Sequence, residues 1–387
     1  MADKLKQVLV IGAGIGGLCA AIALKRRLPE THVTIYEKAP KFAVVGAGLT
    51  LWANAIKALR MLDITEERLG GARLLRSELL SSMGRPFSSI DMAEMDRELG
   101  ASSVAVHRAD LHHVLLEQAE RLDIAVQVGA VCTGYRQDAS GVEAQFQNGS
   151  AVSGDLLIGA DGIHSAVRAM FLPQVKLRYA GYIGWRGVLH YPDPAVHMRT
   201  SEIWGCGMRF GVVPIGDGRI YWFATANYPA GRTPSPAENK ADLERRFCSW
   251  HAPVDALVQS TPAEDILYND IYDFKPLPRW SDGRVVLLGD AAHATTPNLG
   301  QGACQAIESS VVLARCLAES EDLHAALAQF ETQRKPRTSW VTNQSWRLGG
   351  IGQLQNGLVC TLRSFGMRAM PDSFFRKQLV QSAGYSV

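Results

Sequence analysis

Three glycines near the start of the chain have the spacing of a turn that can hold a phosphate group. Gly12, Gly14 and Gly17 follow the apolar residues 8–11 and precede a proline-free segment, residues 17–27, that is rich in helix formers. In such a turn Gly12 permits the tight bend, Gly14 lets the backbone approach a pyrophosphate, and Gly17 lets the helix pack closely on the strand. The unpaired N–H groups and the positive dipole end of the helix would attract the pyrophosphate. The sequence therefore predicts a strand–turn–helix unit that binds a dinucleotide.

An acidic residue completes this unit. Residues 34–37 read as the next strand and end in Glu37, twenty residues after Gly17. A carboxylate at this place can accept hydrogen bonds from both hydroxyl groups of an adenosine ribose, and Lys38 is assigned to the same cofactor site. Because NAD and FAD both carry an adenosine diphosphate, this fingerprint alone does not separate the two cofactors.

Two further segments favour FAD over NAD. Residues 156–168 read as another strand–turn–helix unit, with Asp161 and Gly162 in its turn, and residues 285–288 read as a buried strand that ends just before Asp290. Ligands of parallel sheets lie at the carboxyl ends of the strands, where both acidic residues are placed. At that edge the carboxylate of Asp290 suits the hydroxyl groups of a ribityl chain. Asp161 is assigned to the same cofactor site.

A glycine-flanked helix start follows the third strand. Pro297 interrupts the chain, and Gly300, Gln301 and Gly302 open a helix that is expected to run from about residue 303 to 317. The N–H groups at its amino end would point at the N1–C2=O edge of a flavin, where reduction places negative charge. This physical fit assigns Pro297 and residues 300–302 to the flavin site.

With these three motifs in this order, the chain resembles the single-component (class A) FAD-dependent monooxygenases, the aromatic hydroxylase family with the p-hydroxybenzoate hydroxylase fold. The resemblance extends from about residue 8 to residue 337. Within the family, the chain looks most like the branch that holds urate hydroxylase, zeaxanthin epoxidase and 6-hydroxynicotinate hydroxylase. The urate branch has an aspartate where this chain has Asn298, and this departure counts against urate as the substrate.

The resemblance adds two residues to the flavin site and implies a reaction. Residues 45–49 resemble the family's loop beside the flavin ring and contain Gly48, and Arg108 matches the family's FAD-contacting arginine. In such enzymes NADH or NADPH reduces bound FAD, O2 adds to give a flavin C4a-hydroperoxide, and an electron-rich substrate takes one oxygen atom. The implied substrate is a small aromatic or heteroaromatic molecule that is hydroxylated or epoxidised. Because the chain holds a single dinucleotide fingerprint, NAD(P)H is expected to bind transiently.

Two other functions are compatible with the same fold. One is an FAD-dependent reductase of isoprenoid-type double bonds. The other, from a different class, is a carrier on the flavoprotein fold that performs no redox chemistry. The three intact flavin motifs favour an enzyme over the carrier.

Candidate catalytic residues lie on strand-like runs in the middle of the chain. Arg209 and Tyr221 fall on two runs, residues 201–214 and 219–226, that are joined by a short Asp-Gly connection typical of a hairpin. The two side chains are expected to share a face, which the resemblance puts over the flavin, where the urate branch uses an equivalent arginine and tyrosine. Arg209 could hold a substrate oxyanion there. The alternative is that Arg209 is an exposed strand charge and Tyr221 a packing residue.

Three more residues are candidates for substrate contacts. Phe223 shares a strand face with Tyr221, because side chains alternate along a strand. Trp185 and Arg186, on the preceding strand-like run, are expected to line the same pocket.

The order of the motifs implies a discontinuous α/β architecture. We expect a Rossmann-like FAD-binding domain of the glutathione reductase type, an inserted and mainly antiparallel substrate sheet, and C-terminal helices. The FAD-binding domain is expected at residues 1–75, 103–178 and 276–340. The substrate sheet is expected at residues 76–102 and 179–275, and the C-terminal helices at residues 341–387.

The C-terminal part is the hardest to interpret. A long helix is expected over residues 322–345. Beyond it, one amphipathic face is expected, formed by Arg363, Phe365, Met367, Arg368 and Met370. Packing of this face against the body of the protein or a second subunit is favoured over contact with a membrane.

Composition sets further limits. The 387 residues include 40 Lys and Arg against 38 Asp and Glu, and no basic stripe indicates a nucleic-acid partner. The seven cysteines are scattered and form no CxxC pair, so neither a disulfide framework nor a metal site is indicated. No apolar run reaches transmembrane length. These features predict a cytoplasmic monomer or homodimer whose partners are O2 and a small-molecule substrate.

Overall fold

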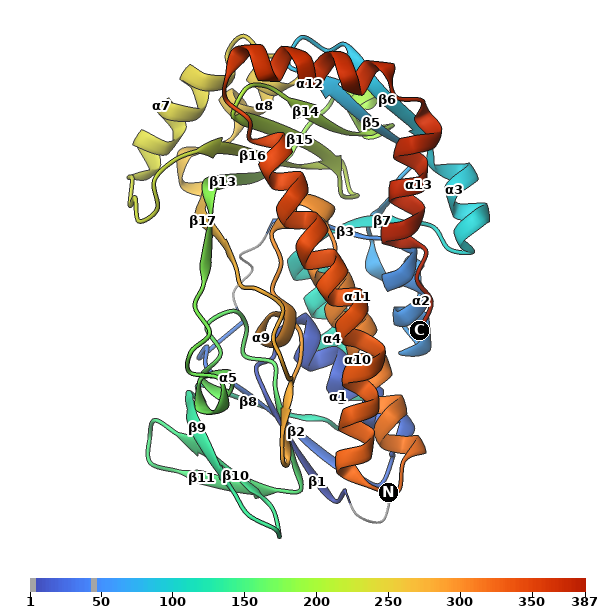
Figure 1. The fold of residues 1–387 in the computed structure, drawn as a ribbon, viewed down its shortest axis with the longest axis vertical. Helices are drawn as coiled ribbons and strands as arrows, with labels where there is room; N and C mark the ends of the chain where they lie inside the picture. The colour runs from blue at the N-terminus through green and yellow to red at the C-terminus, as the bar shows by residue number, and fades with distance from the viewer. Residues whose placement is uncertain (1–4, 43–46) are drawn as a thin grey trace.

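The computed structural model describes residues 5–42 and 47–387. A six-stranded sheet lies in the lower half of the elongated molecule and a seven-stranded sheet in the upper half, while the long helix α11 runs between the two ends (Figure 1). Two three-stranded sheets accompany them. The expected α/β flavoprotein fold is confirmed.

The six-stranded sheet has the strand order β18-β19-β12-β1-β2-β8, and its central strands pair in parallel. Its central strands are aliphatic because helices cover both faces of a parallel sheet and exclude water from it. The strands are β1 (Gln7–Ile11), β2 (His32–Glu37), β8 (Ala125–Val128), β12 (Leu156–Gly159), β18 (Ser281–Asp282) and β19 (Val285–Leu287).

Helices α1 (Ile15–Arg27) and α10 (Gly302–Glu319) pack against each other beside this sheet. Helix α1 follows its N-cap residue Gly14 and begins two residues before the expected residue 17, whereas α10 begins at Gly302 and extends two residues beyond the expected end. The other elements of this half are α2 (Ala53–Met61), η1 (Glu66–Leu69), α4 (Arg108–Arg121), α5 (Ala166–Phe171), α9 (Asp290–His293), η3 (Pro297–Leu299), the sheet of β3 (Gly48–Leu51), β4 (Ala72–Arg73) and β7 (Val104–His107), and the sheet of β9 (Cys132–Gln137), β10 (Val142–Phe146) and β11 (Ala151–Gly154).

The seven-stranded sheet has the order β17-β13-β16-β15-β14-β5-β6 and is antiparallel except where β14 pairs with β5. The sequence suggested one strand over residues 201–214, but the chain turns at residues 205–207, where Gly207 has φ +66°. The strands are β5 (Arg76–Ser81), β6 (Pro86–Asp91), β13 (Arg178–His190), β14 (Thr200–Trp204), β15 (Met208–Pro214), β16 (Arg219–Asn227) and β17 (Leu267–Asp273).

One face of this sheet carries its own hydrophobic core beneath α7 (Pro236–Phe247) and α8 (Val254–Ser260), which includes Phe210, Trp222 and Phe247. The opposite face therefore remains available for the flavin side of the molecule. Shorter elements of this half are α3 (Met92–Leu99), α6 (Pro194–His197) and η2 (Ala263–Asp265).

Three helices end the chain: α11 (Leu323–Gly352), α12 (Gly357–Ala369) and α13 (Asp372–Ala383). The first continues past the expected end at residue 345. The predicted amphipathic face on α12 is wrong, because Met367 is buried while Phe365 is 75% exposed. These two side chains lie on different sides of the helix.

A buried polar network ties the helices of the lower half together. Glu308 on α10 and Arg334 on α11 form an ion pair at 2.6 Å, and both side chains are fully buried. Asn54 on α2 donates to the same carboxylate. The Arg334 guanidinium also donates to the Ser309 hydroxyl at 3.1 Å, and that hydroxyl lies 3.1 Å from Nε2 of His293 on α9.

We expect Glu308→Ala to lower the free energy of unfolding by about 3–5 kcal/mol, because it leaves the Arg334 charge buried without its partner. Urea unfolding of the FAD-saturated protein measures this change. The matched control is Glu319→Ala, which removes an exposed carboxylate from the same helix and should shift stability by less than about 0.5 kcal/mol. Equal effects of the two substitutions would contradict a structural role for the ion pair.

His293 gives the stability a pH dependence. Burial, assisted by the charge of Arg334, lowers its pKa from 6.5 to about 3. The unfolded chain therefore binds a proton between these pH values that the folded chain does not. The free energy of unfolding should fall by up to about 1.4 kcal/mol for each pH unit below 6.5. The free energy of unfolding, measured at several pH values between about 7 and about 4, should depend less steeply on pH for His293→Gln than for the parent.

Candidate functional site

Three backbone turns meet at the carboxyl edge of the six-stranded sheet. A Cβ atom at Gly12 would lie 2.5 Å from the carbonyl oxygen of Ala160, and one at Gly16 would lie 3.8 Å from the Cα of Gly289. The first motif therefore touches both of the others. Gly12 has φ +103°, which glycine adopts without strain. Three segments that are far apart in the sequence thus form one continuous surface.

The first turn leaves room for a ligand at the amino end of α1. A Cβ atom at Gly14 would meet nothing within 4 Å, whereas a Cβ atom at Gly17 would lie 1.9 Å from the carbonyl oxygen of Gly12. Glu37 reaches back to this turn, where its Oε2 atom accepts a hydrogen bond from the N–H of Ala13 at 2.8 Å. Lys38 is exposed beside it. Helix N–H groups and open space together suit a pyrophosphate.

The second turn is fixed by its own acid and by a buried cation. Asp161 Oδ2 accepts from the N–H of Val167 at 3.2 Å, so this carboxylate braces the start of α5. Its other oxygen is buried without a hydrogen-bond partner among the described residues, and burial raises the pKa of the group. Arg168 donates to the carbonyl oxygens of Ile163 and Ala291, at 2.6 and 3.0 Å. This guanidinium joins the second turn to the third.

Asp290 begins α9 on the third turn. Its side chain is exposed to solvent, and yet surrounding protein raises the pKa of the carboxyl group, an effect that the nearby charge of Arg108 opposes. An accessible acid with this much protein around it lies on the wall of a cleft. Arg108, at the start of α4, is itself exposed. The structure thus brings together an acid and a cation that are far apart in the sequence.

The loop before α10 closes this edge. Pro297 and Gly300 are exposed, and Gly300 adopts φ +61°. Gln301 is fully buried, and its Oε1 accepts from Asn54 at 2.9 Å, while its Nε2 has no partner among the described residues. Gly302 starts the helix. The backbone N–H groups of α10 are therefore presented beside the same cleft.

These features fit FAD. Gly14 faces open space, Asp161 keeps one unpartnered oxygen, and Asp290 is accessible at the end of β19. Together they offer N–H donors for a pyrophosphate and a carboxylate for ribityl hydroxyl groups. Gly48 begins β3 in a separate three-stranded sheet, and residues 45 and 46 of the expected flavin loop lie outside the described residues. A side chain at Gly48 would collide with the ring of Tyr221, 2.5 Å away.

The strand register places four candidate residues on one face of the seven-stranded sheet. Phe223 pairs with both Arg186 and Gly211, while Arg209 and Tyr221 occupy positions two residues away on either side along this face. Arg209 and Tyr221 therefore share a face, as expected, with Phe223 between them. Tyr221 packs 6.1 Å from the Phe223 ring.

The expected position of Trp185 in the substrate pocket is wrong. Adjacent strand residues point to opposite faces, so Trp185 cannot share the pocket with Arg186. It is fully buried in the core beneath α7, where its Nε1 donates to Asn239 at 3.1 Å.

Arg209 is a buried cation, only 2% exposed, rather than an exposed strand charge. Its guanidinium pairs with Glu202 at 3.2 Å and donates to the side-chain oxygen of Asn298. Asn298 in turn donates to the carbonyl oxygen of Ser345 on α11, at 2.8 Å. Arg209 therefore links the substrate sheet to the loop before α10.

Tyr221 and Arg186 form a second polar pair on this face. Burial raises the pKa of the Tyr221 hydroxyl, while the charge of Arg186 and a hydrogen bond from it oppose the shift. Arg186 is half-buried and also donates to Asn269 at 3.1 Å. This pair forms a more accessible part of the face than Arg209 does.

Sequence reasoning missed three positioning contacts. Arg168 joins two motifs, His112 places Nε2 at 2.8 Å from the carbonyl oxygen of Ala13, and Glu202 balances Arg209. Arg168 lies seven residues after Asp161 and could have been suspected as a polar residue on the buried side of a short helix. The other two contacts cross between elements and leave no local signal.

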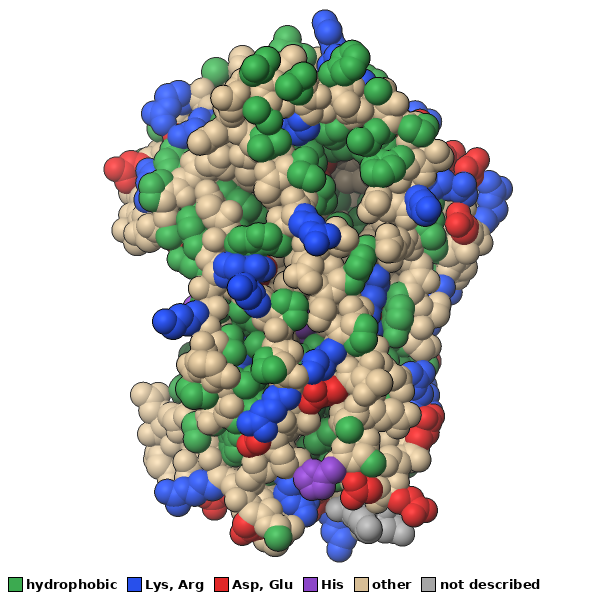
Figure 2. Space-filling view, in the orientation of Figure 1, with side chains coloured by type: hydrophobic (Ala, Val, Ile, Leu, Met, Phe, Trp, Pro, Cys, Tyr) green, Lys and Arg blue, Asp and Glu red, His purple; other side chains and the backbone are tan. Residues whose placement is uncertain are grey.

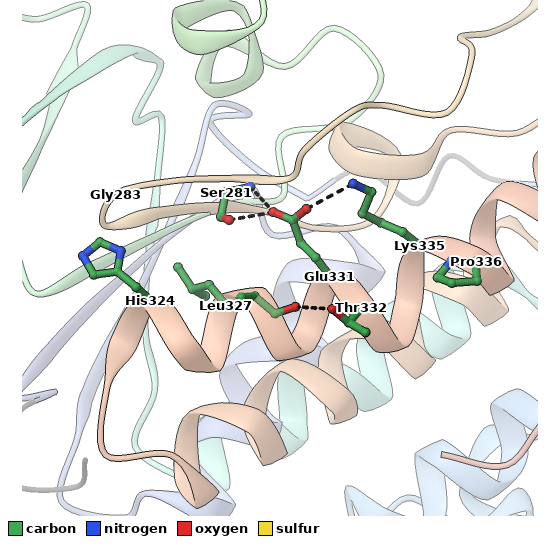
Figure 3. A pocket seen from close by; sticks show the side chains of 9 residues that line it. Ser281, Gly283, His324, Leu327, Glu331, Thr332, Lys335 and Pro336 are labelled. Atoms are coloured by element: carbon green, nitrogen blue, oxygen red, sulfur yellow. Dashed lines mark hydrogen bonds and ion pairs between the residues drawn. The ribbon is translucent and has the colours of Figure 1, made fainter.

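A separate shallow hollow lies between α11 and β18 (Figure 3). At its centre Glu331 accepts from the N–H and hydroxyl of Ser281, at 2.8 and 2.6 Å, and pairs with Lys335 at 3.3 Å. Since this carboxylate is already engaged, the hollow is a weaker candidate than the cleft at the three turns. Across residues 5–42 and 47–387, no cluster of side chains could hold a metal ion and no helix is long and apolar enough to cross a membrane.

Known proteins resemble this chain over nearly its whole length. The FAD binding domain family matches residues 6–345. The aurachin C monooxygenase/isomerase of Stigmatella aurantiaca is 42% identical over 364 residues, which cover 94% of each chain. The FAD-dependent urate hydroxylase of Klebsiella pneumoniae is 37% identical over 341 residues, or 86% of each chain.

A solved structure agrees. The crystal structure of Klebsiella pneumoniae HpxO with FAD and uric acid matches with a TM-score of 0.91 at 32% identity, covering 98% of this chain and 96% of that chain. The expected flavin cofactor and reaction type are thereby confirmed. The chain belongs to the FAD-binding, class A monooxygenase family and is an FAD-dependent monooxygenase.

Proposed function

We propose that this monooxygenase transfers one oxygen atom from O2 to a small aromatic or heteroaromatic ring that carries a negatively charged oxygen or nitrogen. NADH or NADPH serves as the reductant. The observation that carries this proposal is the buried Arg209, whose guanidinium joins the substrate sheet to Asn298 on the loop before α10. A buried cation at this junction favours an anionic ring, and an anionic ring is electron-rich.

The cofactor site in this proposal is built from the converging turns. The amino end of α1 at Gly14 holds the pyrophosphate, Glu37 the adenosine ribose, and Asp290 the ribityl hydroxyl groups. Arg108 balances the charge of Asp290, and the amino end of α10 faces the flavin ring. When bound, FAD accepts electrons from NAD(P)H and activates O2.

The substrate side is a division of labour between a buried and an accessible part. Arg209 is nearly inaccessible, so it acts through its charge and by fixing Asn298. Arg209 contacts Asn298, which is neutral, and Glu202. Only Glu202 therefore compensates the positive charge of Arg209, and its carboxylate is partly exposed. Tyr221, Phe223 and Arg186 then form the wall against which the ring lies. This arrangement orients the ring and excludes water from it.

The relatives support an oxygenated ring substrate over the two alternatives. Both curated relatives are named for oxygenation, of aurachin C in one case and of urate in the other. Neither is named as a reductase of isoprenoid double bonds or as a carrier. This chain has Asn298 where the urate branch has an aspartate, and this difference still counts against urate as its substrate.

The function is tested by following NADH and NADPH oxidation by the FAD-loaded enzyme with aurachin C, urate, phenols, hydroxypyridines, quinolones, indoles and purines. Product must be measured with isotopically labelled O2, because uncoupled turnover releases hydrogen peroxide and mimics activity. We expect a ring compound with an ionisable group to yield a product that carries one labelled oxygen. Reduction of an isoprenoid double bond without use of O2 would contradict the proposal.

Two glycine variants separate ligand binding from folding. Gly14→Val should give a soluble, folded protein with little or no FAD, because the new side chain enters the open space that the proposal assigns to the pyrophosphate. Gly17→Ala should fail to fold, because its Cβ would lie 1.9 Å from the Gly12 carbonyl oxygen. Flavin absorbance per protein and circular dichroism report the two outcomes. Stoichiometric FAD in Gly14→Val would show that this turn does not bind the cofactor.

Arg209→Met should keep the FAD content while lowering kcat/KM for the true substrate by about 10²–10³-fold, the usual loss for a single charge-stabilising donor. Arg209→Lys, which keeps the charge, should restore part of kcat and reduce hydrogen peroxide release; a packing role alone would make the two variants alike. Arg199→Met is the matched control, since Arg199 pairs with Glu78 at 3.6 Å and lies outside the candidate site. Unchanged kcat/KM in Arg209→Met would remove Arg209 from the site.

A further inference from the structure

Helix α12 carries an apolar face that points away from the protein. Leu358, Leu362 and Phe365 are 72%, 63% and 75% exposed. Their spacing of four and three residues puts them on the same side of the helix. Such exposure is unusual for three large apolar side chains in a row, and a contiguous patch of this kind marks an interaction surface.

The opposite side of α12 is anchored to the body of the protein. Cys360 and Met367 are buried there, and Met367 packs with Phe87 and Trp204 of the substrate sheet. Arg363 donates to the carbonyl oxygen of Gly205 at 2.8 Å. These contacts hold the helix in place, so its apolar face is exposed on a fixed element of the fold.

Other exposed apolar side chains lie after α12 in the chain or in the same half of the molecule. Met370 and Phe374 are 40% and 44% exposed, and Met83, in the turn between β5 and β6, is 73% exposed. In Figure 1, α12 lies across the upper end of the long axis, and in Figure 2 hydrophobic side chains gather over that end. A helix that lies across the end of an elongated molecule can meet a flat surface without interference from the rest of the protein.

The charges around this face are mostly positive. Residues 357–383 contain Arg363, Arg368, Arg376 and Lys377 but a single acid, Asp372. Of these, Arg368, Arg376 and Lys377 are exposed, and Arg376 pairs with Glu98 at 2.7 Å. This excess contrasts with a whole chain whose net charge is +2.

We propose that α12 and the adjoining start of α13 dock the enzyme onto the surface of a bilayer that contains anionic phospholipid. Leu358, Leu362 and Phe365 enter the boundary between headgroups and acyl chains, and Arg368 and Lys377 meet the phosphate groups. The helix lies in the plane of the interface, because its apolar face runs along the helix and points away from the protein.

A second copy of the chain fits this face less well. In a two-fold dimer the same patch meets itself, so the positive excess of residues 357–383 would be doubled within one interface that offers a single acid per copy. An anionic bilayer accepts both the apolar side chains and the charges. Docking at this end also turns the substrate sheet, rather than the six-stranded sheet, toward the bilayer.

The test uses the FAD-loaded protein and sedimentation with vesicles of phosphatidylcholine alone or mixed with phosphatidylglycerol. The parent protein should sediment with the mixed vesicles, and added salt should weaken this binding. Leu362→Ser/Phe365→Ser should reduce the bound fraction by about tenfold or more, because most of the inserted apolar area is lost. Its flavin content and soluble activity should equal those of the parent, since neither residue belongs to the cofactor or substrate site.

Two further variants make the result specific. Val128→Ser/Met170→Ser removes two exposed apolar side chains, 46% and 50% exposed, from the other half of the molecule and should bind vesicles like the parent. Arg368→Glu/Lys377→Glu should weaken binding to mixed vesicles selectively. The proposal is overturned if the parent does not bind mixed vesicles, or if Leu362→Ser/Phe365→Ser binds them equally well. It is likewise overturned if light scattering shows a dimer that this substitution splits, with no vesicle binding by the monomer.

Discussion

The close approach of three backbone turns at one edge of a parallel sheet is the constraint on which the rest of the structure depends. No side chain fits between Gly12 and Ala160, or between Gly17 and the turn that precedes it, because a Cβ atom would lie within 2.5 Å of a carbonyl oxygen in each case. This contact lets helix N–H groups and two carboxylates converge on one cleft. The segments that form the substrate sheet lie between these motifs in the sequence, so the turns determine where the sheet is placed.

The sequence was sufficient wherever the signal was local. Glycine spacing, the acid at Glu37 and the helix start at Gly302 follow from rules about neighbouring residues, and the fold follows from their order. Side-chain direction across a sheet is different, because it depends on register. Trp185 and Arg186 were assigned to one pocket although neighbouring strand residues alternate, and only the pairing with β16 shows which of them faces the flavin side. The turn at residues 205–207, the bond from Arg168 to Ala291 and the contact of His112 with Ala13 depend on partners far away in the sequence.

Two buried arginines show how the same residue type serves different purposes. Arg334 pairs with a fully buried carboxylate and donates to two hydrogen-bond acceptors, so groups within the protein compensate its charge. Arg209 has a neutral amide and a partly exposed carboxylate as partners. Incomplete compensation costs stability, and such a cost is commonly found where a charge serves a ligand. This contrast supports our proposal that Arg209 acts on the substrate, whereas Arg334 is a structural cation.

The strand pairing also governs how the chain must fold as it is made. β1 pairs with β12 about 150 residues later, and β5 pairs with β14 across more than a hundred residues. The last strands of the two large sheets, β17 (residues 267–273) and β19 (residues 285–287), lie close together in the chain. Neither sheet can therefore be completed before this short stretch has left the ribosome, and both can be completed soon after it. The two halves should mature as one cooperative unit and not as successive domains, with unpaired strand edges exposed through most of synthesis.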